Sequence, residues 1–434
     1  MTTPAATLLK KHFPSADVTY LVEEPYRRLV EGHPAVDRVI AVPAEQRFGD
    51  FLGLIRRVRR ERFDVLLDFH GGPRASWITA ASGARFKIGY AIKRKGFLYD
   101  VGIPRRGPDG PIHSVRNHVN LVRAMGVDID DAEIPPLTLP AASAEEMARV
   151  ERIVKGRAFD SPLARGLDTR ASKAEADPRA KPGAPAGAGV RAEAPAPGDL
   201  VDSLVKDVAD VVREADIADA ARDAAAAKLV VLHIGAGNRF RDWGAANAAS
   251  LVRLLAGMPG VRIALIGADG DRTAEAEILR AAPAATLPLA GLLNLIEVRE
   301  LIARATLYVG PDSGPMHIAA STATPLVAYF GPTLPAVFAP WRPCGAPGRP
   351  AVFAPWQPNG VPWQPGVFAP SRPPGAPGRP GGVSGRPGCV PTVVLEKSLD
   401  CRPCRQRECV TMDYRCLLTI TADEVFAACR QFLL

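Results

Sequence analysis

The stretch TLYVGPDSGPMHIAASTATPLVAYFGPT, residues 306–333, decides the fold class of this chain. It begins with an apolar strand, Thr306–Val309, continues through a polar loop into the helical segment MHIAAST, and returns to an apolar strand, Pro325–Phe330. Two apolar strands that flank a helix form a βαβ unit, whose strands are parallel. The stretch therefore predicts an α/β domain built on a parallel sheet.

The same alternation is found on both sides of this stretch. Apolar runs rich in Val, Ile and Leu predict strands, and helix-length segments fill the intervals between them. The further predicted strands are Asp17–Val22, Arg38–Val42, Asp64–Phe69, Leu229–Ile234 and Val261–Ile266, and the predicted helices are Gly49–Arg62, Ala245–Leu255, Asp271–Ala281, Leu295–Arg304 and Thr421–Leu433. Two α/β lobes account for this order.

Two stretches of biased composition interrupt the lobes. Residues 156–225 are rich in Ala, Pro and charged residues and nearly lack aromatics, which is typical of a segment that cannot offset its ordering entropy. Residues 336–391 hold 15 of the 42 prolines and repeat with a period of 15 residues, because AVFAPW at 336 returns at 351. We predict that both stretches are largely disordered and that the second contributes nothing to a core.

The predicted organisation has five parts. An N-terminal lobe covers 1–155, the first insertion 156–225, a second lobe 226–335 and the second insertion 336–391, and a Cys-rich segment with a C-terminal helix, 392–434, completes the second lobe. The sequence has no apolar run long enough to span a membrane, and its first residues lack the apolar core of a secretory signal. Seven cysteines, six of them after residue 388, are too few and too unevenly placed for a disulfide framework. We expect a cytoplasmic protein.

The positive charge of the chain is concentrated near its beginning. Residues 1–125 hold 21 Lys and Arg against 12 Asp and Glu, while the whole chain has a net charge of +8. Basic runs at 56–62 and at Lys93, Arg94 and Lys95 favour an anionic partner: nucleic acid, a phosphorylated substrate or an acidic membrane surface. A solvated helix face explains 56–62 equally well. Because no nucleic-acid-binding module is present and aromatic residues make up only 6% of the chain, we expect no nucleic-acid partner.

Loops after the strands of the second lobe are the candidate binding sites, because parallel α/β lobes bind ligands at the carboxyl ends of their strands. The loop HIGAGNRFRDW, residues 233–243, combines two glycines with Arg239 and Arg241, cations suited to phosphate. In the loop GADGDRTAEAE, residues 267–277, Asp271 stands at a helix start and is placed to accept hydrogen bonds from ribose hydroxyls. An ordinary acidic helix cap is the alternative for Asp271.

The loop at 309–322 carries the strongest of these signals. Asp312 and Ser313 are good helix N-cap residues, Gly314 leaves the backbone accessible, and His317 lies on the first turn of the helix that follows. The free N–H groups and the dipole of such a helix start favour an anion. A well-capped helix without a ligand is the alternative. Together the loops indicate a lobe that binds a diphosphate-linked nucleoside, opposite a basic lobe that takes an anionic acceptor.

At this point the sequence resembles a known family. PDSGPMHIAASTATPLVAYFGPT (311–333) is similar to the signature of the ADP-heptose lipopolysaccharide heptosyltransferases, glycosyltransferase family 9, and further similar segments lie at 21–43, 62–90 and 113–128. The resemblance implies a GT-B fold of two Rossmann-like lobes. It also implies an inverting, metal-independent transfer of heptose from ADP-heptose to the lipopolysaccharide inner core, with lipid A–Kdo or a partial core as acceptor, at the cytoplasmic face of the inner membrane.

The resemblance assigns roles to individual residues. Asp312, Ser313, Gly314 and His317 fall on the donor-binding signature of the family. Arg241 stands where members usually have a phosphate-binding lysine, and Asp271 stands where a glutamate usually contacts the nucleoside. Asp68 and His70, which end the strand 64–69, are expected near the cleft on the acceptor side, where they orient loops. Lys93, Arg94 and Lys95 are expected on the same side.

The beginning of the chain departs from the family pattern. Members open with a strand, a Gly-Asp loop and a helix, and TTPAATLLKKHFP resembles only that helix. The strand and the aspartate that would act as general base have no counterpart here, and loss of a central strand leaves apolar surface and unpaired backbone on its neighbours. We favour a start codon that lies upstream, because the downstream pattern is intact. The alternative is an inactive copy that binds a nucleotide sugar or acts as a scaffold.

A cluster of cysteines lies close to the end of the chain. Cys401, Cys404, Cys409 and Cys416 have the spacing C-x2-C-x4-C-x6-C, which is tight enough to surround a structural zinc ion or an iron–sulfur cluster. Free thiols or an adventitious disulfide are the interpretation that we favour, since similar cysteines occur in family members whose catalysis needs no metal. We therefore expect no cofactor beyond the nucleotide-sugar donor.

Overall fold

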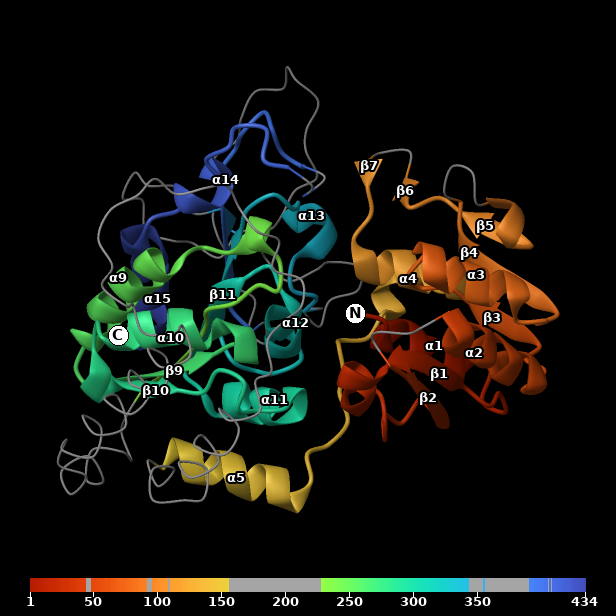
Figure 1. The fold of residues 1–434 in the computed structure, drawn as a ribbon, viewed down its shortest axis with the longest axis horizontal. Coiled ribbons are helices and arrows are strands. Elements are labelled where there is room, and N and C mark those ends of the chain that lie inside the picture. The colour runs from red at the N-terminus through yellow and green to blue at the C-terminus, as the bar shows by residue number, and fades with distance from the viewer. Residues whose placement is uncertain are drawn as a thin grey trace, which may run out of the picture.

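The computed structural model describes residues 1–43, 48–91, 96–107, 110–155, 228–342, 354–355, 390–404, 406 and 408–434. These residues form two α/β lobes that lie side by side (Figure 1). Helix α5 (Ala144–Val154) follows the connection out of the first lobe and lies against the second. Among the described residues, no helix is long and apolar enough to cross a membrane.

The second lobe is built on one parallel sheet. Its strand order is β10-β9-β8-β11-β12-β14-β13, and every neighbouring pair is parallel. Consecutive residues of the central strand β8 (Lys228–His233) point to opposite faces, so Leu229 and Val231 enter one core and Val230 and Leu232 the other. The remaining strands are β9 (Val261–Ile266), β10 (Thr286–Pro288), β11 (Leu307–Pro311), β12 (Leu326–Phe330), β13 (Ala354–Pro355) and β14 (Thr392–Glu396).

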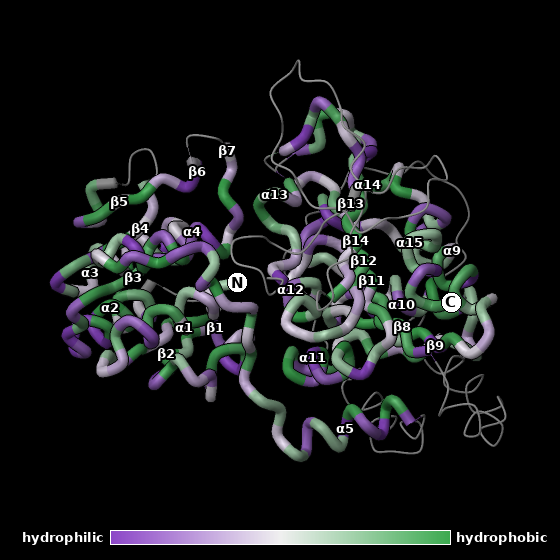
Figure 2. Tube along the Cα trace, turned by 180° about the vertical axis from the view of Figure 1, so that it is seen from behind, coloured by the Kyte–Doolittle hydropathy of each residue, from purple (hydrophilic) through white to green (hydrophobic). Residues whose placement is uncertain are grey.

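Helices cover both faces of this sheet. On the face of Val230 and Leu232 lie α9 (Ala245–Ala256), α10 (Arg272–Leu279), α14 (Arg415–Leu418) and α15 (Ala422–Leu433). On the other face lie α5, α11 (Leu295–Arg304), α12 (Gly314–Ala320) and α13 (Pro335–Phe338). Figure 2 shows the central strands of this lobe mainly in hydrophobic colours, as expected for strands that are buried on both faces.

The first lobe has two separate parallel sheets. β1 (Thr19–Glu23) pairs with β2 (Arg38–Val42), whereas β3 (Val65–Leu67), β4 (Phe86–Tyr90) and β5 (Val101–Ile103) form a second sheet. A short antiparallel pair, β6 (Arg106–Gly107) and β7 (Gly110–Pro111), follows them. The helices of this lobe are α1 (Thr3–His12), α2 (Phe48–Arg60), α3 (Pro73–Ala81) and α4 (Ser114–Arg123).

Among the described residues, no strand joins the two sheets of the first lobe, and β1 and β3 each have a strand partner on one side only. All three residues of β3 are only half-buried, whereas all five residues of β11 in the second lobe are buried. α1 confirms that TTPAATLLKKHFP is a helix.

Most of the predicted elements are present in the structure. Every predicted strand and helix is found, with ends that differ by two residues or fewer. β14 was missed because its three apolar residues follow a Pro- and Gly-rich stretch that carries no strand signal. α5 was placed with the first lobe at 1–155, yet Val150 and Ile153 are buried in the core of the second lobe.

The prediction that residues 336–391 contribute nothing to a core is wrong for Ala339 and Trp341, which are both buried. Trp341 is 3% exposed and packs in the core that α1 and α4 share. Its Nε1 donates a hydrogen bond to the Pro135 carbonyl at 3.0 Å, and His113 Nε2 donates to the Ala339 carbonyl at 2.9 Å. The end of the apolar half of the repeat, residues 339–341, is buried here because a complementary surface of the first lobe lies beside it, whereas Ala336 is exposed. Residues 343–353, 356–389 and 156–227 lie outside the described residues, so the rest of both predicted insertions is not tested.

Candidate functional site

In the sheet of the second lobe, the order of the strands reverses next to β8. β9 and β10 follow on one side of β8, and β11 and β12 follow on the other. The loops that leave the carboxyl ends of β8 and β11 therefore diverge from adjacent positions. In open parallel sheets, ligands bind in the crevice at such a switch point. The segments that meet here are 233–243 after β8, 312–313 after β11 and 331–333 after β12.

Asp312 and Arg241 form the charged centre of this site. The Asp312 side chain is almost fully buried, and its Oδ2 accepts a hydrogen bond from Thr333 Oγ1 at 2.6 Å. Arg241 Nη1 lies 3.6 Å from the same oxygen and donates to the Asp312 carbonyl at 3.0 Å. Burial raises the pKa of the Asp312 carboxyl, while Thr333 and Arg241 oppose the rise. These contacts hold the guanidinium at the switch point.

The Arg241 guanidinium keeps hydrogen-bonding capacity for a ligand. Its Nε is buried, and among the described residues it has no hydrogen-bond partner. A guanidinium has five N–H donors in a fixed fork, which matches the oxygens of a phosphate group. Arg241 lies in a short 3-10 turn, Arg239–Arg241, where Asn238 accepts from the Phe240 N–H at 2.9 Å. The local turn therefore sets the direction of the arginine toward β11.

Ser313 precedes α12, but its hydroxyl does not cap the helix. No side-chain capping bond is present, so the prediction of a side-chain N-cap is wrong for both Asp312 and Ser313. The Ser313 hydroxyl instead meets His233 Nδ1 at 3.0 Å and the Pro311 carbonyl at 3.1 Å. Burial lowers the pKa of His233 to about 3, so this imidazole is neutral at pH 7. The Ser313 hydroxyl therefore bonds to buried groups on β8 and β11, and it does not bond to the helix N–H groups that the sequence pattern suggested.

Gly314 and His317 lie at the beginning of α12. Gly314 is exposed, and a Cβ placed there would meet open space. His317 is half-buried and its Nδ1 has no partner among the described residues. Burial, together with the positive charges of the Met1 amino group, His113 and Arg241, holds the pKa of His317 well below 6.5. Because α12 has only seven residues, the positive potential of the site comes mainly from Arg241.

Asp271 brings the third predicted loop to the edge of the same site. Its Oδ2 accepts a hydrogen bond from the Ala268 N–H at 2.7 Å, which closes the 3-10 turn Asp269–Asp271. Asp271 stands at the N-cap position of α10 but makes no side-chain capping bond to that helix. The carboxylate also lies directly over the loop after β8, since a Cβ added at Gly235 would come within 1.9 Å of Asp271 Oδ2. Position 235 therefore requires glycine, because a larger side chain would collide with the Asp271 carboxylate.

Asp68 and His70 lie at the carboxyl end of β3 in the first lobe. Asp68 is 4% exposed and accepts hydrogen bonds from the N–H groups of His70 at 3.0 Å and Gly71 at 2.8 Å and from the Tyr99 hydroxyl at 2.6 Å. With its oxygens occupied, this carboxylate orients the loop at 70–72 and is poorly placed to accept a proton from a substrate. The basic run Lys93, Arg94 and Lys95 lies outside the described residues.

Glu275 is a buried carboxyl near the site that the sequence did not single out. It lies on α10, one turn beyond Asp271, and accepts a hydrogen bond from the Ala290 N–H at 2.8 Å. Burial raises the pKa of Glu275 from 4.5 to about 7. The segment TAEAE resembles an exposed acidic helix start, so only the packing of α10 on β10 shows that this carboxyl is buried.

Replacing Glu275 by glutamine is expected to change the pH dependence of stability. The folded protein binds the Glu275 proton more tightly than the unfolded chain, so its contribution is complete below about pH 4.5 and is lost as the pH rises to about 7. Glu275→Gln mimics the protonated form and should be more stable than the parent protein above pH 7 by up to about 3 kcal/mol, with no difference below pH 4.5. Urea unfolding at a series of pH values measures the difference. Glu277→Gln, on the exposed face of the same helix, is the matched control and should show no such trend.

Comparisons with known proteins agree with this site. Residues 201–344 match glycosyltransferase family 9 (heptosyltransferase). A lipooligosaccharide heptosyltransferase 2 of Haemophilus influenzae is 42% identical over 85 residues, which are 19% of this chain and 25% of that protein. A lipopolysaccharide heptosyltransferase 3 of Escherichia coli is 45% identical over 53 residues, which are 12% of this chain and 16% of that protein. The aligned parts thus span a quarter or less of these relatives.

Solved structures support the fold of both lobes. The E. coli ADP-heptose lipopolysaccharide heptosyltransferase II has a TM-score of 0.56 at 17% identity, over 100% of this chain and 94% of that one. A family 9 glycosyltransferase of Veillonella parvula has a TM-score of 0.54 at 18% identity, over 78% and 79%. Such identities show the GT-B fold alone, while the family match covers β8, β11, β12 and the loops that carry Arg241, Asp312 and Ser313. Residues 201–344 therefore match glycosyltransferase family 9, the heptosyltransferases, and the whole chain has the GT-B fold.

Proposed function

We propose that this protein transfers heptose from ADP-heptose to the inner core of lipopolysaccharide. The observation that carries the proposal is the Arg241 guanidinium, which Asp312 holds at the switch point of a family 9 lobe with its Nε unpaired. The curated relatives are heptosyltransferases by name, and one protein of the same fold is an ADP-heptose lipopolysaccharide heptosyltransferase. A nucleoside diphosphate sugar fits a site that combines a fixed cation with accessible backbone N–H groups.

Each part of the donor has a proposed partner in the second lobe. Arg241 would bind the diphosphate, and the exposed backbone at Gly314 leaves room for its oxygens. Asp271 lies at the edge of the site, where its second carboxylate oxygen would accept a ribose hydroxyl. Ser313 and His317 would complete the pocket beside the sugar as neutral hydrogen-bonding groups, since burial keeps the His317 imidazole uncharged.

The proposed reaction is a single inverting displacement. An acceptor hydroxyl oxygen attacks C1 of the heptose from the face opposite ADP, the bond from C1 to the β-phosphate oxygen breaks, and the hydroxyl loses its proton. ADP leaves with one additional negative charge on its β-phosphate. Arg241 would stabilise this charge as it develops, which is the role that a metal ion has in other transferases. We infer for this reason that the transfer needs no metal ion.

The first lobe would bind the acceptor. Residues 1–125 carry nine more basic than acidic residues, and a phosphorylated lipid A–Kdo or a partial core is anionic. Such an acceptor is a membrane lipid, so we propose a cytoplasmic protein that contacts the inner face of the membrane peripherally. The Asp68 network and the carbonyl of His70, which accepts from Arg105 Nη2 at 2.5 Å, would fix the acceptor loop.

A transfer assay with defined acceptors tests the proposal. The purified chain is incubated with ADP-heptose and either lipid A–Kdo or a heptose-bearing core, and ADP release and glycolipid products are measured. We expect one acceptor to gain a heptose. Calorimetric titration with ADP distinguishes an enzyme from an inactive scaffold. If the protein binds ADP but forms no product with any acceptor, it is a scaffold that binds a nucleotide sugar. If the protein neither binds ADP nor transfers heptose to any acceptor, the proposal is contradicted.

A further inference from the structure

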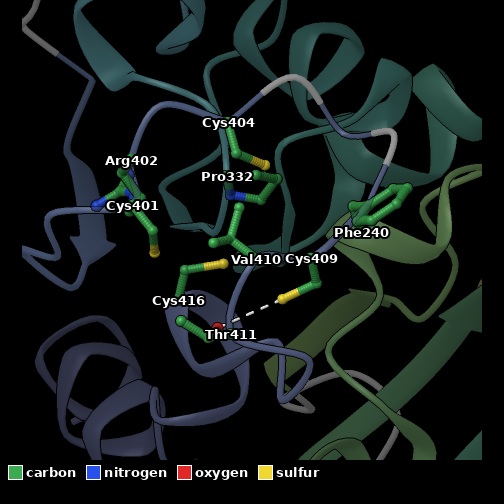
Figure 3. Close-up of a pocket in the computed structure, with 9 residues that line it drawn as sticks. All are labelled: Phe240, Pro332, Cys401, Arg402, Cys404, Cys409, Val410, Thr411 and Cys416. Carbon is green, nitrogen blue, oxygen red and sulfur yellow. Dashed lines mark hydrogen bonds between the residues drawn. The ribbon is translucent and has the colours of Figure 1, made fainter.

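Four cysteine thiols surround one small cavity in the second lobe. Cys401, Cys404, Cys409 and Cys416 all line a space of about 20 Å³, and all four are free thiols. In Figure 3 the sulfur atoms of Cys409 and Cys416 point toward each other, that of Cys404 lies above them, and that of Cys401 lies to one side, beside Cys416. A cavity of this size accommodates one water molecule or one ion and excludes any organic ligand.

The backbone around this cavity has three residues in the left-handed region that is usually occupied by glycine. Gln406, Met412 and Tyr414 have left-handed backbone conformations with φ of 54°, 59° and 50°, although none of them is glycine. Left-handed residues other than Gly, Asn and Asp are uncommon, and clusters of them occur where the chain wraps a ligand. The Cys409 sulfur lies 3.5 Å from the Thr411 hydroxyl oxygen, within the same turn of the chain.

A buried arginine also faces the cavity with an unpaired donor. The Arg402 side chain is 5% exposed and lines the cavity, and its Nε has no hydrogen-bond partner in the described part of the chain. Four thiolates around a divalent ion carry a net charge of about −2, which a neighbouring guanidinium offsets.

We propose that Cys401, Cys404, Cys409 and Cys416 bind one tetrahedral metal ion, zinc or iron, as a structural site. Tetrahedral thiolate sets select these metals, and sulfur–metal distances of about 2.3 Å fit a cavity for a single ion. As they stand, no three donors within the described ranges are close enough to hold an ion. The segment between β14 and α14 has no helix or strand among its described residues, so rotation of the thiols toward the cavity closes the set.

This metal site would brace the loops that form the donor site. The Cys404 N–H donates to the Pro332 carbonyl at 3.2 Å, and Arg402 Nη2 donates to the Thr333 carbonyl at 2.8 Å, next to the hydroxyl that binds Asp312. On the other side, Asn238 Nδ2 donates to Gln406 Oε1 at 2.9 Å. The metal would therefore act through stability of the 233–243 and 331–333 loops and has no part in the displacement itself. The inference stands whether or not the chain transfers heptose.

Metal content of the full-length chain, purified without oxygen and without a metal-affinity tag, tests the proposal. We expect about one zinc or iron per chain by elemental analysis, and iron is distinguished by its visible colour. Each of Cys401→Ser, Cys404→Ser, Cys409→Ser and Cys416→Ser should reduce the content at least about fivefold, because a three-thiolate site binds more weakly. Cys429→Ala is the matched control, because this buried thiol lies on α15 and is not among the residues that line the cavity.

A measurement on the unmodified chain keeps the test independent of variants that fail to fold. Addition of Co²⁺ to the metal-free protein should produce the intense visible bands of tetrahedral cobalt thiolate, and a mercurial that titrates thiols should release one metal ion. Removal of the ion should also lower the midpoint of thermal unfolding. Absence of bound metal together with absence of the cobalt bands would overturn the proposal, as would metal content that the four serine substitutions leave unchanged.

Discussion

Replacing Arg241 by alanine is expected to lower the rate of heptose transfer about 100-fold or more and to weaken binding of ADP. The guanidinium is the fixed cation of the site, held by the Asp312 carbonyl at 3.0 Å and by the Asp312 carboxylate at 3.6 Å. Its loss removes the charge that meets the leaving diphosphate, and it leaves the buried Asp312 carboxylate with Thr333 alone. Initial rates with saturating acceptor and calorimetric titration with ADP measure the two effects.

Two further variants separate charge from position at this site. Arg241→Lys keeps the charge but loses the forked geometry, so it should retain part of the activity. Arg239→Ala removes an exposed arginine two residues away, whose guanidinium lies 5.0 Å from the centre of the Phe240 ring, and should change the rate much less. Equal losses in Arg239→Ala and Arg241→Ala would show that the loop contributes only general positive charge.

Replacing Trp341 by alanine is expected to destabilise the protein by about 3–5 kcal/mol. The indole is 3% exposed, donates to the Pro135 carbonyl, and lies 5.0 Å from the His113 ring between the two lobes. Its removal leaves a cavity beside α4 and an unsatisfied carbonyl on the first lobe. Chemical denaturation measures the loss, and we expect the first lobe to unfold first because its divided sheet has the smaller core.

An exposed tryptophan provides the control for this prediction. Trp77 on α3 is 54% exposed, so Trp77→Ala should change the free energy of unfolding by less than about 0.5 kcal/mol. Because both variants remove an indole, the comparison isolates the effect of burial. If Trp341→Ala were as stable as Trp77→Ala, the buried segment 339–342 would not connect the lobes in solution.

Much of the fold was predictable because it follows from local periodicity. Runs such as KLVVLH and VRIALI are continuous apolar strands in the sequence and continuous buried strands in the structure. The helices between them were predictable for the same reason. The short strands β4, β5 and β10 were not predicted, because three to five residues give little periodic signal and their pairing depends on distant partners.

The candidate site was predictable in its residues and less so in its contacts. The rule that ligands bind at strand ends located Arg241, Asp312 and Ser313 before any contact was known. The hydrogen bonds were not foreseen, because Thr333 and His233 lie 21 and 80 residues away from the groups that they meet. Glu275 was missed altogether, since a carboxyl on a helix looks exposed until the neighbouring strand covers it.

The sequence by itself determined the order of the longer strands and helices, the resemblance to family 9, and the charged residues of the candidate site, because each of these is encoded in short segments. Only the tertiary structure decided that the first lobe's sheet is divided, that Trp341 of a Pro-rich repeat is buried, and that four cysteines share one cavity. Burial and pairing depend on surfaces that are distant in the chain. Composition predicted a repeat too rich in proline for any core, but a complementary surface on the first lobe buries Trp341 of its first copy.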